Sequence, residues 1–335
     1  GNLDLSSLKI TETVKGDTRK DVPISSAKIV GGFLEITFSS EKTYSKAASH
    51  LVEDSRYTNK IRIETACSSK GTADKDYDYS QLGETWSTPR IFRIPSATGD
   101  TNLAEDTYVA VMGGGMGVNT LCVGSNLFVI DLESGGEKPG KLFTKNGPIR
   151  IVDTSPLGIK GKDGDVETLN GSDISNATPA SPVVITPDNA RGIPWRGAMV
   201  YMNDLEGKIT KFNLTNMSSG GGQPIKMYDS TTLFKAGSTK TNGRYMYYPM
   251  DVAIGKTTNQ LWLFAGTGDS LRFNDRSKGT DNLLIGIKDP DYPDYANVAT
   301  PVKADDISDC QDTTNDSSGN KCPQNKDRGL YIKLK

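Results

Sequence analysis

A pattern of proline, short apolar strand, tight turn and second apolar strand occurs three times along this chain, and it restricts the fold more than any other feature. Proline suits the first residue of a strand, where its missing N–H removes no ladder hydrogen bond. A four-stranded unit repeated along a chain is typical of β-propeller blades, and a β-sandwich is the alternative fold. The three opening strands lie in TPRIFRI (88–94), SPVVITP (181–187) and YPMDVAIG (248–255).

Each unit continues with three further strands. The second strand of each unit is apolar on both faces, so we expect these three strands to be buried. The second strands are TYVAVMGGG (107–115), GAMVYMND (197–204) and LWLFAGTG (261–268). The third strands are NLFVIDLES (126–134), KITKFNLT (208–215) and NLLIGIKD (282–289), and the fourth are KLFT (141–144), MYDSTTLFK (227–235) and GLYIKLK (329–335).

The repeat predicts an all-β, β-propeller-like fold in modified or partial form. We expect four-stranded antiparallel blades at about 84–145, 178–237 and 245–335, with long loops inserted between their strands. The blades occupy residues 81–335. Residues 1–80 show no copy of the unit and are predicted to be a β-rich segment with a short helix near 43–54, where apolar residues recur at helical spacing. That segment is a divergent blade, a linker or a partner-binding element.

The glycine run MGGGMG (112–117) raises the question of a phosphate-binding loop. Such a loop joins a strand to a helix, whereas this run lies between two predicted strands. The dinucleotide spacing also fails at Val118, and no Lys-Ser or Lys-Thr follows. We therefore predict a tight turn that needs positive φ or close approach of two backbones.

Several classes of function are excluded by composition. His50 is the single histidine among 335 residues, and catalytic triads and most zinc sites use histidine. We therefore predict no catalytic residues, no enzymatic activity and no cofactor. A net charge of −2 without a long basic run argues against a nucleic-acid partner. No apolar stretch approaches the roughly 20 residues of a membrane-spanning helix.

The chain has four cysteines and no Cys-x-x-Cys pair. Cys310 and Cys322 flank the polar segment QDTTNDSSGNK, which a disulfide would hold in place. We predict that bridge and a second between Cys67 and Cys122, in an oxidising compartment. Unpaired thiols are the alternative.

The segment KDGDVETLNGSD (162–173) holds three candidate metal ligands. Asp163, Asp165 and Glu167 alternate as calcium ligands can. An EF-hand loop would require glycine at Thr168 and glutamate at Ile174, so a solvated acidic loop is the alternative.

The ordered motifs resemble the C-terminal propeller of the PilC/PilY family, which is associated with type IV pilus tips. The resemblance begins at LGETWSTPRIFRI (82–94), continues through YVAVMGGGMG (108–117) and ends at DRGLYIKL (327–334). It implies a non-enzymatic protein outside the cell, at the pilus tip or associated with the outer membrane. It also implies roles in pilus assembly or stabilisation and in adhesion, with minor pilin subunits and a host or surface receptor as partners.

The family propeller often carries a calcium loop where this chain has TPDNARGIPWRG (186–197). Only Asp188 and Asn189 offer suitable oxygens there, while calcium takes six to eight. We therefore predict no calcium in this loop.

Two other functions stay open at this stage. DLESGG (131–136) resembles the turn of quinone-dependent propeller dehydrogenases, and RYMYYP (244–249) could form an aromatic platform of a secreted carbohydrate-binding propeller. For the pilus hypothesis, the inserted loops 146–180 and 289–328 are the expected places of partner contact.

Overall fold

All regular structure in the described part of the chain is β-sheet, apart from two single-turn 3-10 helices, η2 (Leu103–Glu105) and η3 (Ala304–Asp306). The all-β prediction is therefore confirmed for these residues. The computed structural model describes residues 9–13, 19–21, 24–30, 33–38, 60–64, 79, 81–116, 123–133, 140–143, 148–150, 177–188, 192–238, 242–255, 259–268, 282–309 and 328–334.

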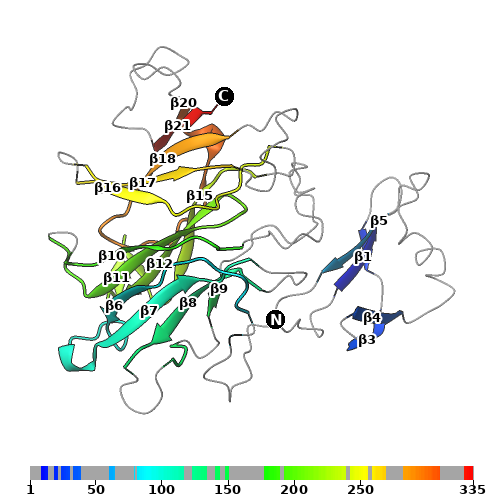
Figure 1. The fold of residues 1–335 in the computed structure, drawn as a ribbon, viewed down its shortest axis with the longest axis horizontal. Helices are drawn as coiled ribbons and strands as arrows, with labels where there is room; N and C mark the ends of the chain where they lie inside the picture. The colour runs from blue at the N-terminus through cyan, green and yellow to red at the C-terminus, as the bar shows by residue number, and fades with distance from the viewer. Residues whose placement is uncertain are drawn as a thin grey trace.

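Three sheets pack face to face in chain order (Figure 1). The β6 sheet has the order β6 (Arg90–Ile94), β7 (Thr107–Gly113), β8 (Asn126–Asp131), β9 (Ile149–Arg150). The β11 sheet has the order β10 (Val183–Ile185), β11 (Gly197–Asn203), β12 (Lys208–Thr215), β15 (Ser230–Lys235), β19 (Val302–Lys303). The β17 sheet has the order β16 (Asp251–Ile254), β17 (Leu261–Gly266), β18 (Leu283–Asp289), β21 (Gly329–Lys333), β20 (Ser308–Asp309).

The strands differ from the predicted ones at the end of each unit. In the β6 sheet the fourth strand is β9, while KLFT forms only one isolated bridge, between Leu142 and Ile130. The two later sheets each gain a short fifth strand, β19 or β20, which pairs in parallel with β15 or β21. The described residues form no closed ring of sheets, so the structure shows three stacked antiparallel meanders.

The β11 sheet is buried on both faces. Every residue of β11 and β12 is buried. Because successive side chains of a strand point to opposite faces, Ala198 and Val200 pack against the β6 sheet, whereas Met199 and Tyr201 pack against the β17 sheet. This double burial explains why the strand is apolar at nearly every position.

The expectation of burial on both faces is wrong for β17. Leu261 and Leu263 are buried, but Trp262 is half-buried and Phe264 is exposed. The reason is position in the stack, since no described sheet covers the outer face of the β17 sheet. In β7 the interior residues are buried, while Tyr108 is exposed at its start.

The first part of the predicted loop 289–328 is packed rather than free. After β18, residues 290–309 add β19 to the β11 sheet and then β20 to the β17 sheet. Tyr295 is fully buried on the way, and the indole Nε1 of Trp195 donates a hydrogen bond to the Pro293 carbonyl oxygen (2.8 Å). This segment, which we call the strap, therefore joins the two sheets.

A buried ion pair lies beside the strap. Lys211 Nζ, on β12, is 2.6 Å from Asp289 Oδ2 at the end of β18, and both side chains are fully buried. The same ammonium donates to the Asp294 carbonyl oxygen (2.7 Å), and the Tyr201 hydroxyl donates to Asp289 Oδ2 (2.7 Å). Burial, followed by the charge of Asp289, raises the pKa of Tyr201 well above its ordinary value, so the hydroxyl stays a donor.

We predict strong coupling between Lys211 and Asp289. Lys211→Met and Asp289→Asn each leave one buried charge unpaired and should lower the free energy of unfolding by about 3 kcal/mol or more. The double variant removes both charges, so its loss should fall short of the sum by roughly 1–3 kcal/mol. Urea unfolding measures all three. Lys226→Met, at an exposed lysine, is the control and should change stability by less than about 0.5 kcal/mol; additive losses would contradict the coupling.

In the described part of the glycine run, residues 112–116, the predicted positive φ and close backbone approach are found, but Gly115 and Met116 form β-bridges to Thr178 and Glu84 rather than a tight turn. Gly113 ends β7, and a Cβ there would lie 2.2 Å from the Thr178 carbonyl oxygen. Gly115 has a φ of +88°, and a Cβ there would lie 2.5 Å from the Glu84 carbonyl oxygen. The run therefore serves backbone packing between β7 and the segments before β6 and β10.

Two glycines with similar positive φ allow the effect of backbone strain on stability to be distinguished from the effect of a steric clash. Gly115→Ala should destabilise by more than Gly192→Ala, because Gly192 (φ +78°) has open space around its Cβ position. Gly192→Ala should lower the free energy of unfolding by only about 1–2 kcal/mol, because alanine must adopt a left-handed backbone conformation there. Thermal unfolding of the two variants tests this, and equal losses would show that the contact with Glu84 is unimportant.

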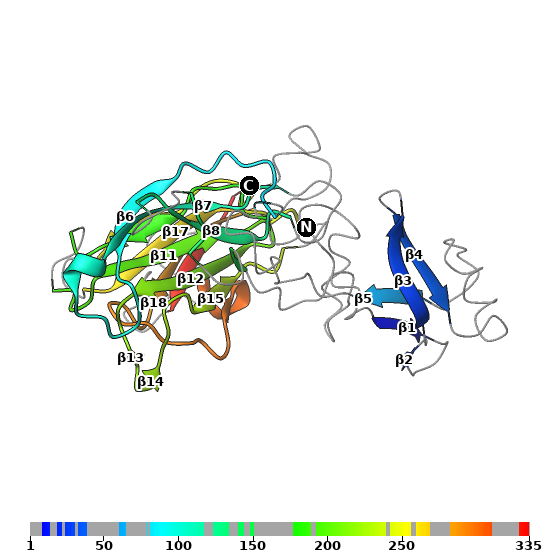
Figure 2. The same cartoon turned by 90° about the horizontal axis from the view of Figure 1, so that it is seen from below.

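The N-terminal strands form two small sheets of their own. β1 (Lys9–Thr13) pairs with β2 (Arg19–Asp21) and β5 (Lys60–Glu64), and β3 (Ile24–Val30) pairs with β4 (Phe33–Phe38). Figures 1 and 2 both show them apart from the three stacked sheets. A division of the chain near residue 80 remains a prediction. The predicted helix near 43–54, with His50, lies outside the described residues.

In the described ranges, no helix has the length and apolar character needed to cross a bilayer.

Candidate functional site

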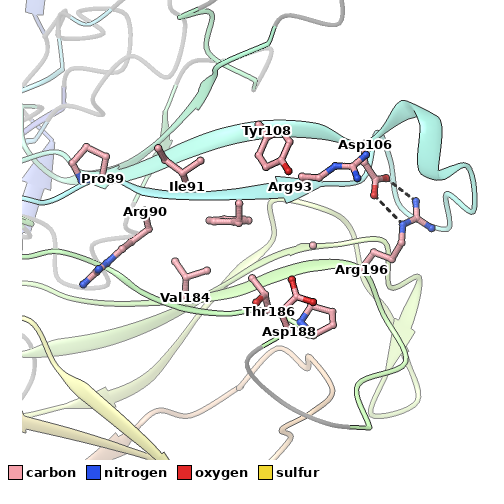
Figure 3. Close-up of a pocket in the computed structure, with 13 residues that line it drawn as sticks. Pro89, Arg90, Ile91, Arg93, Asp106, Tyr108, Val184, Thr186, Asp188 and Arg196 are labelled. Atoms are coloured by element: carbon pink, nitrogen blue, oxygen red, sulfur yellow. Dashed lines mark hydrogen bonds and ion pairs between the residues drawn. The ribbon is translucent and has the colours of Figure 1, made fainter.

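A groove of about 770 Å³ runs between β6 and β10, the first strands of two neighbouring sheets (Figure 3). Each is an edge strand, hydrogen-bonded on one side only among the described residues. Its walls combine apolar, basic and acidic side chains. The lining residues are Pro89, Arg90, Ile91, Phe92, Arg93, Asp106, Tyr108, Val184, Thr186, Pro187, Asp188, Arg196 and Gly197.

The groove exists because the two sheets are offset. β6 lies over β11 rather than over β10, with Phe92 packed in the cluster that contains Ala198 and Val200. The face of β10 that points toward the β6 sheet therefore has no described strand above it, and Val184 stays half-buried there. β10 forms the floor of the groove, and the edge of β6 forms a wall.

One end of the groove is closed by an ion-pair cluster around Arg196 (Figure 3). Its guanidinium donates to both carboxylate oxygens of Asp106, at 2.9 and 3.2 Å. It also donates to the Asp100 carboxylate (3.2 Å) and to the Asp100 carbonyl oxygen (3.1 Å). A planar guanidinium suits this forked arrangement, which fixes the loop between β6 and β7 against the start of β11.

The pKa shifts in this cluster follow its hydrogen bonds. The backbone N–H of Asn102 donates to Asp100 and lowers the pKa of that carboxyl below its ordinary value, and the charge of Arg196 acts in the same direction. The hydrogen bond with Asp106 raises the pKa of Arg196. Asp100 and Arg196 are thus charged at neutral pH, and the two neighbouring aspartates already occupy the guanidinium of Arg196.

Two other arginines are available to a ligand. The side chain of Arg90 is exposed and makes no hydrogen bond or ion pair with a described residue. Arg93 donates to the Leu103 carbonyl oxygen (3.1 Å) and lies 5.6 Å from the centre of the Tyr108 ring, but it pairs with no described carboxylate. Asp188 stands exposed on the opposite wall (Figure 3). The groove can therefore recognise an anionic, partly apolar ligand.

Most of the predicted site residues lie outside the described part of the chain. These are the calcium candidates Asp163, Asp165 and Glu167 and the cysteines Cys67, Cys122, Cys310 and Cys322. They remain predictions. Within the described ranges, no three His, Cys, Asp or Glu side chains gather as metal ligands would.

Described residues of the segment 186–197, where the family propeller often has a calcium loop, have other roles in the structure. Asp188 borders the groove, Trp195 is buried against the strap, and Arg196 closes the groove. The absence of calcium from it remains a prediction.

The tyrosine segment 244–249 offers little exposed aromatic surface. Tyr245 and Tyr247 are buried and pack edge to face, 6.3 Å apart, and only Tyr248 is exposed. The segment forms no strand; it packs as a loop that precedes β16. Burial of Tyr245 and Tyr247 therefore argues against an exposed aromatic platform at this segment.

The groove was not predicted from the sequence. Arg90 and Arg93 stood in the quoted strand TPRIFRI, and two arginines in an otherwise apolar edge strand are a detectable signal. The contact of Arg196 with Asp106 spans ninety positions, and no local pattern indicates it.

Comparisons with known proteins show a structural likeness but no sequence match. No protein-family model matches the chain, and no curated sequence matches it. The structure is similar to the crystal structure of the Pseudomonas aeruginosa PilY1 C-terminal domain, with 14% identity and a TM-score of 0.44. The match covers 82% of this chain and 54% of that one, so this chain spans about half the length of the solved structure.

The lowered pKa of Asp100 predicts a pH-dependent contribution to stability. A carboxyl group whose pKa is lowered by folding stabilises the folded protein at pH values above its ordinary pKa. This stabilisation is lost as the pH falls through the lowered pKa. The thermal midpoint of Asp100→Asn should lie below that of the native chain at pH 7, with the difference shrinking below about pH 4. Asp188→Asn is the control and should keep the native midpoint at pH 7. A difference that is independent of pH would contradict the charge-based explanation.

Proposed function

We propose that this chain is a type IV pilus tip-associated protein that helps to assemble or stabilise pili and binds surfaces or hosts without catalysing a reaction. In this proposal its sheets are blades of a propeller-like scaffold. It acts at the cell surface or beyond it, at the pilus tip, with minor pilin subunits and a surface receptor as partners. Association with the outer membrane fits the same setting.

The observation that carries the proposal is the position of the family-like motifs. The segments that resemble the PilC/PilY propeller occur in the family's order from residue 82 to 335. In the structure they occupy equivalent strands of successive sheets. The proline-led segments contain β6, β10 and β16, each an edge strand, and the next apolar segments form β7, β11 and β17. A repeat whose units match in both sequence and topology supports a shared architecture.

The groove supports a binding role. Its residues offer cationic, apolar and hydrogen-bonding groups, which suit recognition of a partner.

No observation on the described residues favours the quinone-dependent dehydrogenase or the carbohydrate-binding propeller. The three tryptophans lie in different places: Trp86 is exposed before β6, Trp195 is buried against the strap, and Trp262 stacks on Phe264 on the outer face of the β17 sheet.

Deletion of the gene in its native host tests the proposal. We expect fewer surface pili, loss of twitching and weaker adherence, all restored by the native gene. A second complementing allele, Lys211→Met, should restore piliation and adherence only in part, because it weakens the contact between the β11 and β17 sheets. Lys226→Met, at an exposed lysine, should restore fully. Pilus counts, motility and fractionation of the protein are the measurements. Unchanged piliation and adherence with a cytoplasmic protein would refute the proposal.

A further inference from the structure

We propose that the free edge of β6 receives a strand from an acidic partner protein, and that this strand fills the groove above β10. The inference deepens the proposed function, on which its setting at the pilus rests. The site is a place for strand addition, and its ligand is an extended peptide segment that carries carboxylates. Four features of the groove lead to this occupant.

The first feature is the geometry of the edge. β6 is paired with β7 through all five of its residues, in antiparallel register from Arg90–Val111 to Ile94–Thr107. On the other side it has no described partner. In an antiparallel ladder some backbone N–H and C=O groups of an edge strand point away from its neighbour. The β6 edge thus presents hydrogen-bonding groups to the groove.

The second feature is the offset of the two sheets. β6 lies over β11, so the place over β10 is vacant among the described residues. A strand added beside β6 would lie about 4.8 Å from it, which is the normal spacing within a sheet. It would then sit above the half-buried Val184, about one sheet spacing away. The added strand would extend the β6 sheet and complete the stacking on the β11 sheet.

The third feature is that the groove wraps both faces of β6. Phe92 lines it on the face that packs against the β11 sheet, and Ile91, a residue that is 65% exposed, lines it on the opposite face. A ligand that only filled the gap between the sheets would contact one face. An added strand, whose side chains alternate, contacts both.

The fourth feature is charge. Arg90 points into the space between β6 and the floor (Figure 3), and Arg93 lies on the other face of the same strand. Neither is paired with a described carboxylate, whereas Arg196 is already neutralised by Asp100 and Asp106. Two such edges would repel each other, so a second copy of this chain is disfavoured there. A strand with carboxylates on both faces is favoured.

The test uses the full chain and a fluorescent peptide of about six residues, the length of a typical strand. The peptide has the sequence Glu-Glu-Val-Val-Glu-Glu, which places glutamates on both faces of the strand. We expect saturable binding that weakens as salt rises from about 0.05 M to about 0.5 M. We also expect slower amide hydrogen exchange at alternate residues of β6. A lysine-valine peptide should bind at least about tenfold more weakly, because its charge is reversed.

A third peptide isolates the backbone contribution. It keeps the glutamate-valine sequence, but every backbone nitrogen is methylated, which removes the N–H donors of both edges and so blocks strand addition. It should lose binding although its charge is unchanged. Binding equal to that of the parent peptide would overturn the proposal, because the attraction would then be electrostatic alone.

Protein variants locate the site. Arg90→Glu and Arg93→Glu should each weaken binding of the glutamate-valine peptide by about tenfold. Lys141→Glu, at an exposed lysine beside the far side of the β6 sheet, makes the same change of charge and should leave the affinity unchanged. Far-UV circular dichroism and thermal unfolding check that each variant folds.

The outcomes separate the two proposals. No binding, equal binding of the lysine-valine peptide, or equal loss in Lys141→Glu overturns strand addition, while a pilus defect on gene deletion would still support the proposed function. Binding with all the expected controls, but normal piliation and adherence without the gene, supports the site and refutes the pilus setting.

Discussion

Burial of the β11 sheet on both faces is the constraint on which the rest of the structure depends. β11 and β12 have no exposed residue, so each face needs a complete neighbour. The β6 sheet covers one face and the β17 sheet the other.

The two interfaces of the β11 sheet differ in the side chains they bury. The interface with the β6 sheet is mainly apolar, and the interface with the β17 sheet also holds Lys211 and Asp289. A buried pair is costly to desolvate, and here it is satisfied by Tyr201 and by the carbonyl oxygen of Asp294. The pair forms only when Lys211 of β12 lies opposite Asp289 at the end of β18, so it specifies the alignment of the two sheets.

The strap turns this contact into a covalently connected joint. The chain leaves β18 at Asp289, pairs with β15 through β19, and returns to the β17 sheet as β20. Trp195, from the segment before β11, is hydrogen-bonded to it. The middle and last sheets are therefore held together by packing, by an ion pair and by shared strands. The β6 sheet relies on packing and on loop contacts such as the one between Arg196 and Asp106.

The groove follows from the same architecture. An offset between two sheets exposes the first strand of one sheet beside the edge of the other, and in this chain that edge carries arginine side chains. Rigid, buried sheets hold the groove in place, since β7 and β11 behind it are anchored in the core. A site on such a support needs little reorganisation when a ligand binds. The described structure thus separates a stabilising side, at the strap, from an accessible side, at the β6 edge.

Local patterns in the sequence determined the strands. Alternating and continuous apolar runs, proline before a strand and glycine after it depend on neighbouring residues, so β6 to β8 and β10 to β12 fall where the sequence predicts them. The positive φ and close backbone approach at Gly115 were predictable for the same reason. The tertiary structure alone decided which faces are covered. Phe264 is exposed because of its place in the stack, although β17 is as apolar as β11. It also decided the short strands β9, β19 and β20, the pairing of Lys211 with Asp289, and the groove, because each depends on segments that are distant in the sequence and adjacent only after folding.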